Sequence, residues 1–236
     1  MIQLAMETSG TSGSLAIMSE SEVLQTREFG TESRAAASFA EPLSEMLDEL
    51  RVQTGQNPSL VSVAVGPGSF TGLRIAVSAA KTLAYAIGCK VIPVGSLAAM
   101  AAACTDRWHA RSIPGSESVL VGLNAYRGQV FRAGYDLREI CEPPSGFGRT
   151  DAADWIDRAE AIPRAGWEQE VHEAELAGRL TTYGEGPRSV PDAVGVGRVA
   201  ASLVRTLGES AATISPFELN AHYLKPSSAE EKAAKR

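Results

Sequence analysis

The fold is decided by residues 61–88, which read VSVAVGPGSFTGLRIAVSAAKTLAYAIG. An apolar, β-branched run predicts a strand over 61–65, and the helix-forming stretch 71–87 follows at once. The turn between them, GPGSFTG, holds three glycines, and glycine lets another backbone or an anion approach closely. The N–H groups at a helix N-terminus favour negative charge. The residues alone therefore leave two interpretations open for this turn, tight packing and a phosphate cradle.

Two more specific glycine motifs do not fit the chain. No Gly-Lys-Ser/Thr follows the turn, so it is not a Walker A loop, and Ser69 does not lie in a G-x-S-x-G nucleophile motif. We expect Ser69 or Thr71 to cap the helix that follows, a role worth about 1 kcal/mol. The later run 195–200, GVGRVA, superficially resembles a dinucleotide fingerprint. It follows Pro-Asp-Ala rather than a strand, so we interpret it as a helix start.

Size and composition narrow the class of protein. A chain of 236 residues suits one large domain or two small ones. The net charge of −6 argues against a large, autonomous nucleic-acid-binding surface. Nine acidic residues against four arginines between 151 and 190 are expected to form a solvated helix face. No run reaches the roughly 18 uninterrupted apolar residues of a membrane span, and the N-terminus lacks signal-peptide features. We therefore expect a cytoplasmic protein without membrane contact.

Cysteine and histidine spacing indicates neither disulfides nor a metal site. Cys89, Cys104 and Cys141 are widely spaced and include no C-x-x-C pair, which is typical of a reducing compartment. Zinc-hydrolase motifs place two histidines on one helical face beside a carboxylate. His109 and His172 stand alone in the sequence, as does His222. We expect no metal ion and no cofactor.

The order of expected elements divides the chain in two. The first half predicts strands over 2–7, 14–19 and 22–29, a helix over 34–52, and then the α/β alternation of 61–65, 71–87, 90–94 and 96–104. Pro42 marks either the beginning of the first helix or a kink in it. The second half predicts strands over 119–123 and 129–135 and helices over 152–159 and 192–207, and leaves 160–190 unassigned. The expected boundaries are 1–105, 106–226 and a polar tail over 227–236.

Five stretches carry a resemblance to a known family. The string GPGSFTGLR and the opening MIQLAMETSGTSGSLAIM are similar to the TsaB (YeaZ) family, bacterial proteins required to make threonylcarbamoyladenosine beside the tRNA anticodon. Residues 91–97 (VIPVGSL), 122–130 (GLNAYRGQV) and 222–226 (HYLKP) match as well. The similarity is dense to about Val130 and thin from there to about Val190. It implies an α/β protein with the actin-like ATPase (ASKHA) fold, in which two related subdomains each have a mixed sheet flanked by helices.

The chain departs from the parent fold where that fold binds nucleotide. The parent fold presents an aspartate after its first strand, whereas this sequence has Glu7, whose extra methylene would disturb a metal–phosphate geometry. Asn124 stands where the family commonly shows an aspartate. The resemblance therefore implies no catalytic residue and a degenerate nucleotide-binding site. That site would consist of Glu7, Thr8, Ser9, Gly66, Gly68, Ser69, Thr71 and Gly72.

The helix after the glycine turn is unusually apolar. On a helical wheel, Arg74, Ser78, Lys81 and Tyr85 share one wedge of about 60°, and the rest of 73–87 is apolar, small or threonine. A sheet contact needs only about 100° of apolar arc, and this helix has roughly twice that. The helix is therefore either wholly internal or shared with a partner. The resemblance implies a partner interface formed by Ile75, Ala79, Thr82, Leu83 and Ala86.

The resemblance also implies a function and partners. The chain would be a non-catalytic organising subunit that binds and supports TsaD, which transfers a threonylcarbamoyl group from an adenylate to tRNA adenosine. TsaE would act through the TsaD complex, tRNA would be contacted only through that complex, and the chain alone would be a homodimer. Two alternatives stay open: an active ASKHA-type ATPase or kinase that uses Glu7 and the Gly66–Gly72 turn, and a metallopeptidase, since relatives were once labelled glycoproteases.

Overall fold

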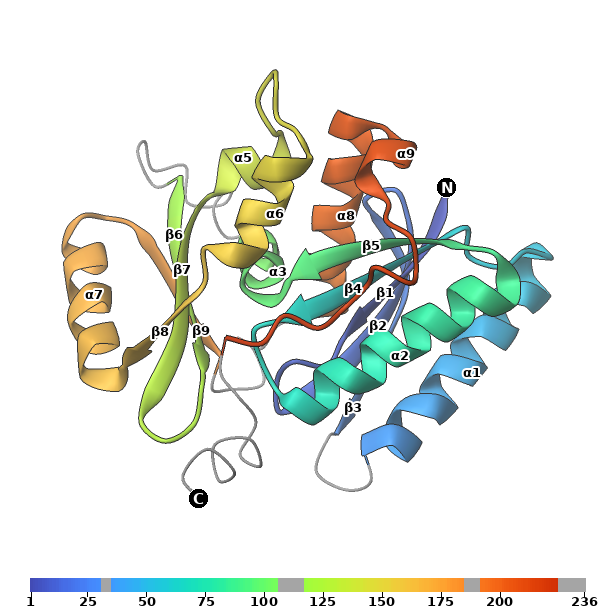
Figure 1. Ribbon diagram of the computed structural model, residues 1–236, viewed down its shortest axis with the longest axis horizontal. Coiled ribbons are helices and arrows are strands. Elements are labelled where there is room, and N and C mark those ends of the chain that lie inside the picture. Colours follow the sequence, from blue (N-terminus) through green and yellow to red (C-terminus); the bar gives the residue numbers. More distant parts are fainter. Residues whose placement is uncertain (31–34, 106–116, 185–191, 225–236) are drawn as a thin grey trace.

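The computed structural model describes residues 1–30, 35–105, 117–184 and 192–224, which form two β-sheets and their covering helices (Figure 1). The first sheet has the order β3-β2-β1-β4-β5. Its strands are β1 (Ile2–Glu7), β2 (Ser12–Ser19), β3 (Glu22–Gly30), β4 (Leu60–Gly66) and β5 (Lys90–Gly95). The first three strands pair antiparallel, whereas β1, β4 and β5 are parallel. The sheet is therefore mixed, as the alternation in the sequence predicts.

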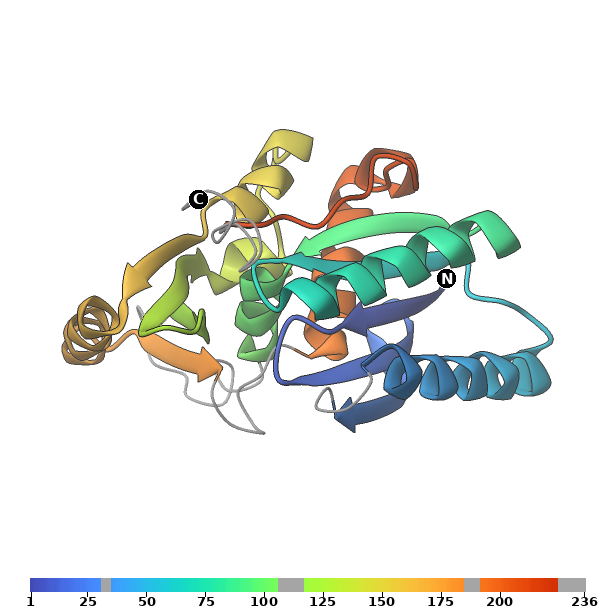
Figure 2. The ribbon, with the colours of Figure 1, turned by 60° about the horizontal axis from the view of Figure 1, so that its bottom comes forward.

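Helices cover both faces of this sheet (Figure 2). One face lies against α1 (Ala35–Thr54) and α2 (Phe70–Ile87), and the other against α3 (Ser96–Ala103) and α8 (Ala193–Leu207). Strand β1 alternates between the two: Leu4 and Met6 belong to the α1/α2 core, and Ala5 belongs to the α3/α8 core. The period of two that defines a strand thus supplies both cores at once.

The second sheet is also mixed and has the order β8-β7-β6-β9. Its strands are β6 (Ser118–Asn124), β7 (Gln129–Asp136), β8 (Glu160–Pro163) and β9 (Leu180–Gly184). Strands β6 and β9 pair in parallel, whereas β7 pairs antiparallel with both β6 and β8. Helix α7 (Arg164–Leu176) covers its outer face, where Trp167 lies directly over Gly122. The remaining short helices are α5 (Leu137–Cys141), α6 (Arg149–Asp157) and α9 (Glu209–Ala212).

The inner face of the second sheet shares a core with the first. Val121 and Tyr135 belong to the same buried cluster as Ala5, Met18 and the α3/α8 layer. Helix α3 therefore lies between the two sheets and contacts both, whereas α8 packs on the first sheet and on α3 (Figure 1). Gly197 permits the close approach of α8, because a Cβ there would lie 2.2 Å from Met18 Sδ.

The architecture of two mixed sheets flanked by helices confirms the predicted fold class. Helix α1 begins at Ala35, so Pro42 lies inside the helix and is not its beginning. Residues 160–190, which the sequence left unassigned, contribute β8, α7 and β9. The domain boundaries stay a prediction, since residues 106–116 and the tail over 227–236 lie outside the described residues. In the described part of the chain, no helix has the length and apolar character needed to cross a bilayer.

Candidate functional site

The candidate site lies at the carboxyl edge of the first sheet. Strands β1, β4 and β5 run in parallel and end there at Glu7, Gly66 and Gly95. Ligands of open α/β sheets bind at such edges, because loops and helix N-termini converge there. The fold therefore brings together the two segments that the sequence predicts as a degenerate nucleotide site, the loop after β1 and the glycine turn before α2.

The loop after β1 fills the space in front of the glycine turn. Ser69 N donates to Ser9 O at 2.8 Å, and Thr8 Oγ1 donates to Gly72 O at 2.8 Å. A Cβ on Gly68 would lie 2.3 Å from Ser9 Cβ, and one on Gly72 would lie 1.9 Å from Thr8 O. These glycines are therefore required by contact between two backbones of the same chain.

A C-terminal segment closes the turn from the other side. Residues 213–224 run as a strap along α2 and end near its first turn, where Tyr223 packs on Phe70 (Figure 2). His222 N donates to Val65 O at 2.7 Å, and a Cβ on Gly66, whose φ is +127°, would lie 2.3 Å from His222 O. The only residue of the turn with a left-handed backbone thus lies under the strap.

Three backbone N–H groups around the start of α2, those of Ser69, Gly72 and Leu73, already have hydrogen-bond partners within the chain. Ser69 is the N-cap of α2, as one of the two sequence alternatives predicts, and its side chain accepts from Gly72 N at 3.2 Å. Leu73 N donates to Ser69 O at 2.9 Å. Thr71, the other candidate cap, is exposed at the start of the helix. The first turn of α2 satisfies these N–H groups internally, which is the usual way a helix terminus is stabilised.

Glu7 lies in the interior of the protein. Its side chain is fully buried, its Oε1 accepts a hydrogen bond from Ser9 N, and its Oε2 has no partner among the described residues. Burial raises the pKa of Glu7 from its ordinary 4.5 to about 7. The hydrogen bonds from Ser9 act in the opposite direction and lower the pKa, and the nearby Asp192 makes a smaller contribution that raises it. Burial likewise raises the pKa of Asp192. A carboxyl group in this position offers no oxygen to a ligand arriving from solvent.

The remaining predicted residues lie elsewhere. Asn124, at the end of β6, accepts a hydrogen bond from Tyr126 N at 3.0 Å and so shapes a hairpin in the second sheet. His222 Nδ1 lies 3.7 Å from Asp157 Oδ1. Within the described ranges, no group of three or more histidine, cysteine, aspartate or glutamate side chains could hold a metal ion.

Helix α2 exposes one flank of its apolar surface. Its buried face is Gly72, Leu73, Ala76, Val77, Ala80 and Ala84. The five residues of the predicted partner interface lie beside that face: Ile75, Ala79 and Leu83 are half-buried against the α1/α2 core, and Thr82 and Ala86 are exposed. Helix α2 is therefore not wholly internal. The polar wedge of Arg74, Ser78 and Tyr85 lies on the side facing solvent and the strap.

Sequence reasoning missed two residues of this site. His222 closes the glycine turn, although the only signal was its place in the short motif HYLKP. Asp192 caps α8 through Gly195 N at 2.6 Å and faces Glu7. The sequence predicts a helix start at 192 but not the proximity of Asp192 to Glu7, which lies 185 residues earlier in the chain.

Comparisons with known proteins agree on one relationship. Residues 31–142 match the family model "TsaD: tRNA N6-adenosine threonylcarbamoyltransferase". The chain is 27% identical over 189 residues to the tRNA threonylcarbamoyladenosine biosynthesis protein TsaB of Bacillus subtilis. The aligned segment covers 78% of this chain and 79% of that protein. It is 29% identical over 131 residues to TsaB of Haemophilus influenzae, which covers 54% of this chain and 51% of that protein.

A solved structure establishes the fold independently. YeaZ from Pseudomonas aeruginosa superposes with a TM-score of 0.61 over 94% of this chain and 99% of its own, at 20% sequence identity. Agreement over nearly the whole of both chains shows the same arrangement of two sheets. The predicted fold class, an α/β protein with two mixed sheets flanked by helices, is confirmed.

The contact between Gly72 and Thr8 generates a stability prediction. We expect Gly72→Ala to lower the free energy of unfolding by about 3 kcal/mol or more, because overpacking against a backbone carbonyl cannot be relieved by a side-chain rotation. Gly134→Ala is the matched control, since a Cβ at Gly134 meets nothing within 4 Å. Denaturant titration followed by circular dichroism measures both. Equal midpoints for the two variants would contradict a packing role for the glycine turn.

Buried Glu7 generates a prediction on pH. Between about 4.5 and 7 the folded protein keeps the Glu7 proton that the unfolded chain releases, so the free energy of unfolding falls as the pH rises through this window. Glu7→Gln, which stays neutral, should be more stable than wild type at pH 8 by on the order of 3 kcal/mol and equal to it near pH 4.5. Exposed Glu45→Gln is the control. Parallel pH profiles for wild type and Glu7→Gln would show that the carboxyl titrates normally.

Proposed function

Because the chain belongs to the TsaB (YeaZ) family, we propose that it is a non-catalytic subunit that binds TsaD, the tRNA N6-adenosine threonylcarbamoyltransferase, and supports its transfer reaction. Proteins named TsaB act in tRNA threonylcarbamoyladenosine biosynthesis, and that pathway is the role of this chain. The finer proposal concerns what the chain does within it: it organises the transferase and performs no chemistry of its own.

The observation that carries this proposal is the closed carboxyl edge of the first sheet. The place where an α/β protein of this kind would hold a nucleotide is filled by Thr8, Ser9 and His222. Glu7, the one acidic side chain of the predicted nucleotide site, is fully buried. If this edge of the sheet cannot take a nucleotide, the chain would act by binding other proteins through its surface.

The flank of α2 supports binding of a protein. Ala79 and Ala86 are small, so a second helix can approach closely, and Ile75 and Leu83 supply apolar area beside them. Interfaces between stable partners are apolar at their centre and polar at their rim. Here the exposed Thr82, a polar member of the predicted interface, contributes to such a rim on the same helix. We propose that this flank binds TsaD and, when the chain is alone, a second copy of itself.

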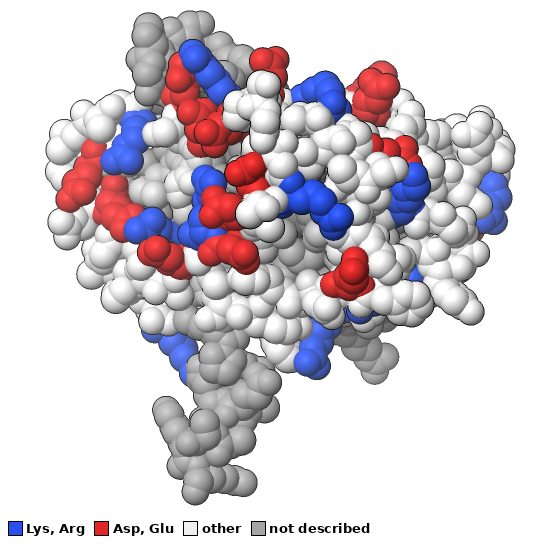
Figure 3. All heavy atoms as spheres, turned by 45° about the horizontal axis from the view of Figure 1, so that its top comes forward, with Lys and Arg blue, Asp and Glu red and all other residues white. Residues whose placement is uncertain are grey.

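The charge distribution supports an indirect relation to tRNA. On the face that carries α6 and α9, basic and acidic side chains are interspersed (Figure 3). Lys90 pairs with Glu209, Arg158 with Asp154, and Arg132 with Glu160. An RNA-binding surface needs unbroken positive charge, because phosphate contacts dominate its affinity. We therefore propose that tRNA and TsaE are engaged through the TsaD complex.

Binding to TsaD yields the first test. Ala79→Arg should leave the protein folded, because Ala79 is only half-buried, but it should abolish the homodimer and weaken TsaD binding at least tenfold, since a long charged side chain cannot enter a close helix contact. Ser78→Arg adds the same charge one residue away, on the exposed wedge. Light scattering after size exclusion, circular dichroism and a TsaD binding assay distinguish the two variants.

The transfer reaction tests the function itself. With TsaD, TsaE, tRNA and threonylcarbamoyl adenylate, we expect modification when the chain is added and almost none when it is omitted. Ser78→Arg should restore the reaction and Ala79→Arg should not. If Ala79→Arg unfolds, α2 is an internal helix. If the variant stays dimeric and active, the interface lies on another surface.

The alternative of an active ATPase or kinase makes a separate prediction. We expect submillimolar Mg-ATP to leave the melting temperature of the isolated chain unchanged, because a ligand that binds only the folded state raises stability by RT ln(1 + [L]/Kd) and this site is closed. Phosphate release measured in parallel should equal that of Glu7→Ala. A clear rise in melting temperature, or turnover lost in Glu7→Ala, would establish the ATPase instead.

A further inference from the structure

Two carboxyl groups lie near the place where α8 begins. Glu7 ends β1 and is fully buried, and Asp192 is the N-cap of α8, where its Oδ1 accepts from Gly195 N at 2.6 Å. The two groups act on one another electrostatically, since the charge of Asp192 raises the pKa of Glu7. The start of α8 is therefore packed on the first sheet beside a second acidic side chain.

Ser14 links Glu7 to the start of α8. It lies directly opposite Glu7 in the antiparallel pair of β1 and β2, and its Oγ accepts from Ala193 N at 2.8 Å. Residues directly opposite in such a pair share one face of the sheet, so Glu7 and Ser14 both face α8. On the other side of the helix, a Cβ on Gly195 would lie 2.2 Å from Ala99 O of α3. The first turn of α8 is thus held between β2 and α3, next to the Glu7 carboxyl.

The Glu7 carboxyl lacks the contacts that would stabilise a negative charge. Its Oε1 accepts from Ser9 N, but its Oε2 has no hydrogen-bond partner among the described residues, and neither has the buried Ser9 Oγ. A buried carboxylate with an unsatisfied oxygen is strongly disfavoured, and a second carboxylate nearby adds repulsion. The packed arrangement therefore suits the neutral form of Glu7, and ionisation of Glu7 opposes it.

The charged groups around the pair act on Asp192 more than on Glu7. Arg198, on α8 itself, lowers the pKa of Asp192, whereas Glu28 on β3 raises it. Among the described residues, the charge that acts on Glu7 is that of Asp192, which has the same sign. Arg198 therefore favours the charged form of Asp192, and Glu7 is the member of the pair whose ionisation disturbs the packing.

We propose that Glu7 and Asp192 form a proton-controlled latch on the first turn of α8. While Glu7 is protonated, this turn stays packed on β2 and α3. When Glu7 loses its proton to solvent, the turn opens and water reaches the carboxylate. Opening exposes the loop after β1, in which Thr8 and Ser9 hold the start of α2. The latch is a property of the chain alone and does not depend on TsaD binding.

Proton linkage fixes the direction and the size of the effect. The pKa of Glu7 is about 7 in the packed arrangement and returns to its ordinary 4.5 once water reaches the group. The packed arrangement is therefore fully stable below about pH 4.5, and its stability falls as the pH rises to about 7. The opening constant rises about tenfold for each pH unit in this window and levels off above it, a total increase of about 300-fold.

Amide hydrogen exchange, followed residue by residue by NMR, tests the latch. The reporters are the amides of Gly195 and Val196, which donate to Asp192 in the first turn of α8. The reference is Val121, which is fully buried in β6 between two paired strands. After correction for intrinsic exchange rates, the reporters should open more readily than Val121, by a factor that rises about 30-fold between pH 5.5 and 8 in wild type. In Glu7→Gln, which stays neutral, reporter opening should not change with pH.

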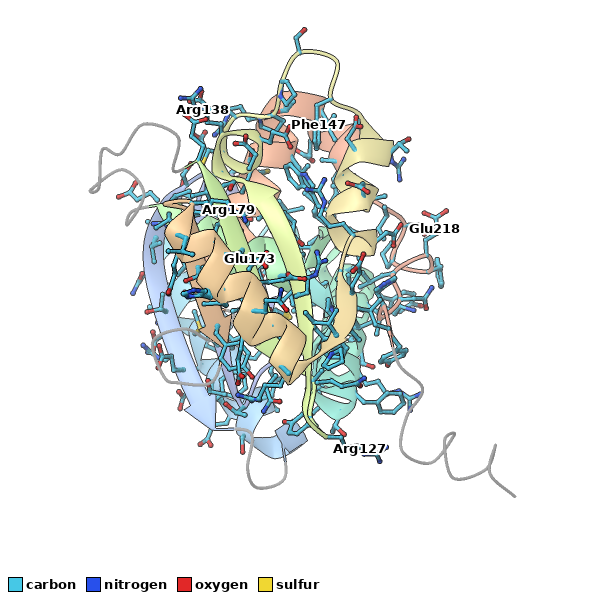
Figure 4. The ribbon with its side chains drawn as sticks, turned by 90° about the vertical axis from the view of Figure 1, so that its left-hand side faces the viewer. Arg127, Arg138, Phe147, Glu173, Arg179 and Glu218 are labelled. Atoms are coloured by element: carbon cyan, nitrogen blue, oxygen red, sulfur yellow. The ribbon has the colours of Figure 1, made fainter. Side chains whose placement is uncertain are left out.

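Two further variants separate the latch from a general effect of charge. Glu173→Gln makes the same change at an exposed carboxyl on α7, which Figure 4 shows on the outer side of the second sheet. Its reporters should follow the wild-type pH profile. Asp192→Asn keeps the cap, because asparagine caps a helix as well as aspartate does. It removes a charge that raises the pKa of Glu7, so its profile should level off at a lower pH.

Several outcomes would overturn the latch. Reporter opening that is independent of pH in wild type does so, and so does a wild-type pH profile in Glu7→Gln, because another group would then be titrating. Reporter opening equal to that of Val121 at every pH means that the turn opens only with the whole protein. An Asp192→Asn profile identical to that of wild type removes Asp192 from the device and contradicts a latch of two carboxyl groups.

Discussion

The carbonyl oxygen of Thr8 lies against the Cα of Gly72, and much of this molecule depends on that contact. A Cβ at residue 72 would lie 1.9 Å from the oxygen, so α2 can approach the loop after β1 only because a side chain is missing. This approach fixes the start of α2 and engages Ser69 N with Ser9 O. On the other side of the turn, the strap is held by His222 N, which donates to Val65 O. A helix displaced by one side-chain radius would open the carboxyl edge and move the flank that we assign to a partner.

The same contact explains how the chain fills this edge of the sheet with its own backbone. An open carboxyl edge presents N–H groups and carboxylates to a ligand. At this edge, Ser69 N donates to Ser9 O and the Glu7 carboxylate accepts from Ser9 N, so both groups are bonded within the chain. Burial raises the pKa of Glu7. Because side chains alternate along β1, Glu7 lies on the same side of the sheet as Ala5, the α3/α8 side, near Asp192. The residues of the predicted nucleotide site are therefore packed against one another in the described part of the chain. We propose that the chain acts through its surface, above all through the half-exposed apolar flank of α2.

Much of the fold could be predicted from the sequence, because its first half has strong local signals. The run 61–65 and the turn after it define β4 and α2 nearly to the residue. Leu73, Val77 and Ala84, which the helical wheel places outside the polar wedge, are buried in the structure. Residues 160–190 could not be assigned, since β8 has only four residues, none of them fully buried, and α7 buries little besides Trp167 and Ala174. The strap was missed for a different reason. Leu219 is fully buried in a core whose strands lie more than 120 residues earlier in the chain, and no local pattern predicts such a contact.

The position of α8 has a consequence for how the protein is made. This helix covers the inner face of the first sheet, with Gly197 against Met18 and Gln3 Nε2 donating to Gly197 O, yet it is synthesised about 100 residues after α3. At a translation rate of 5–20 residues per second, the apolar inner face of the nascent sheet waits roughly 5–20 s for its cover. Ala5 and Ala16 on that face have small side chains, so each exposes little apolar area before α8 covers it. This face of the first sheet is therefore fully covered only after α8 has emerged from the ribosome.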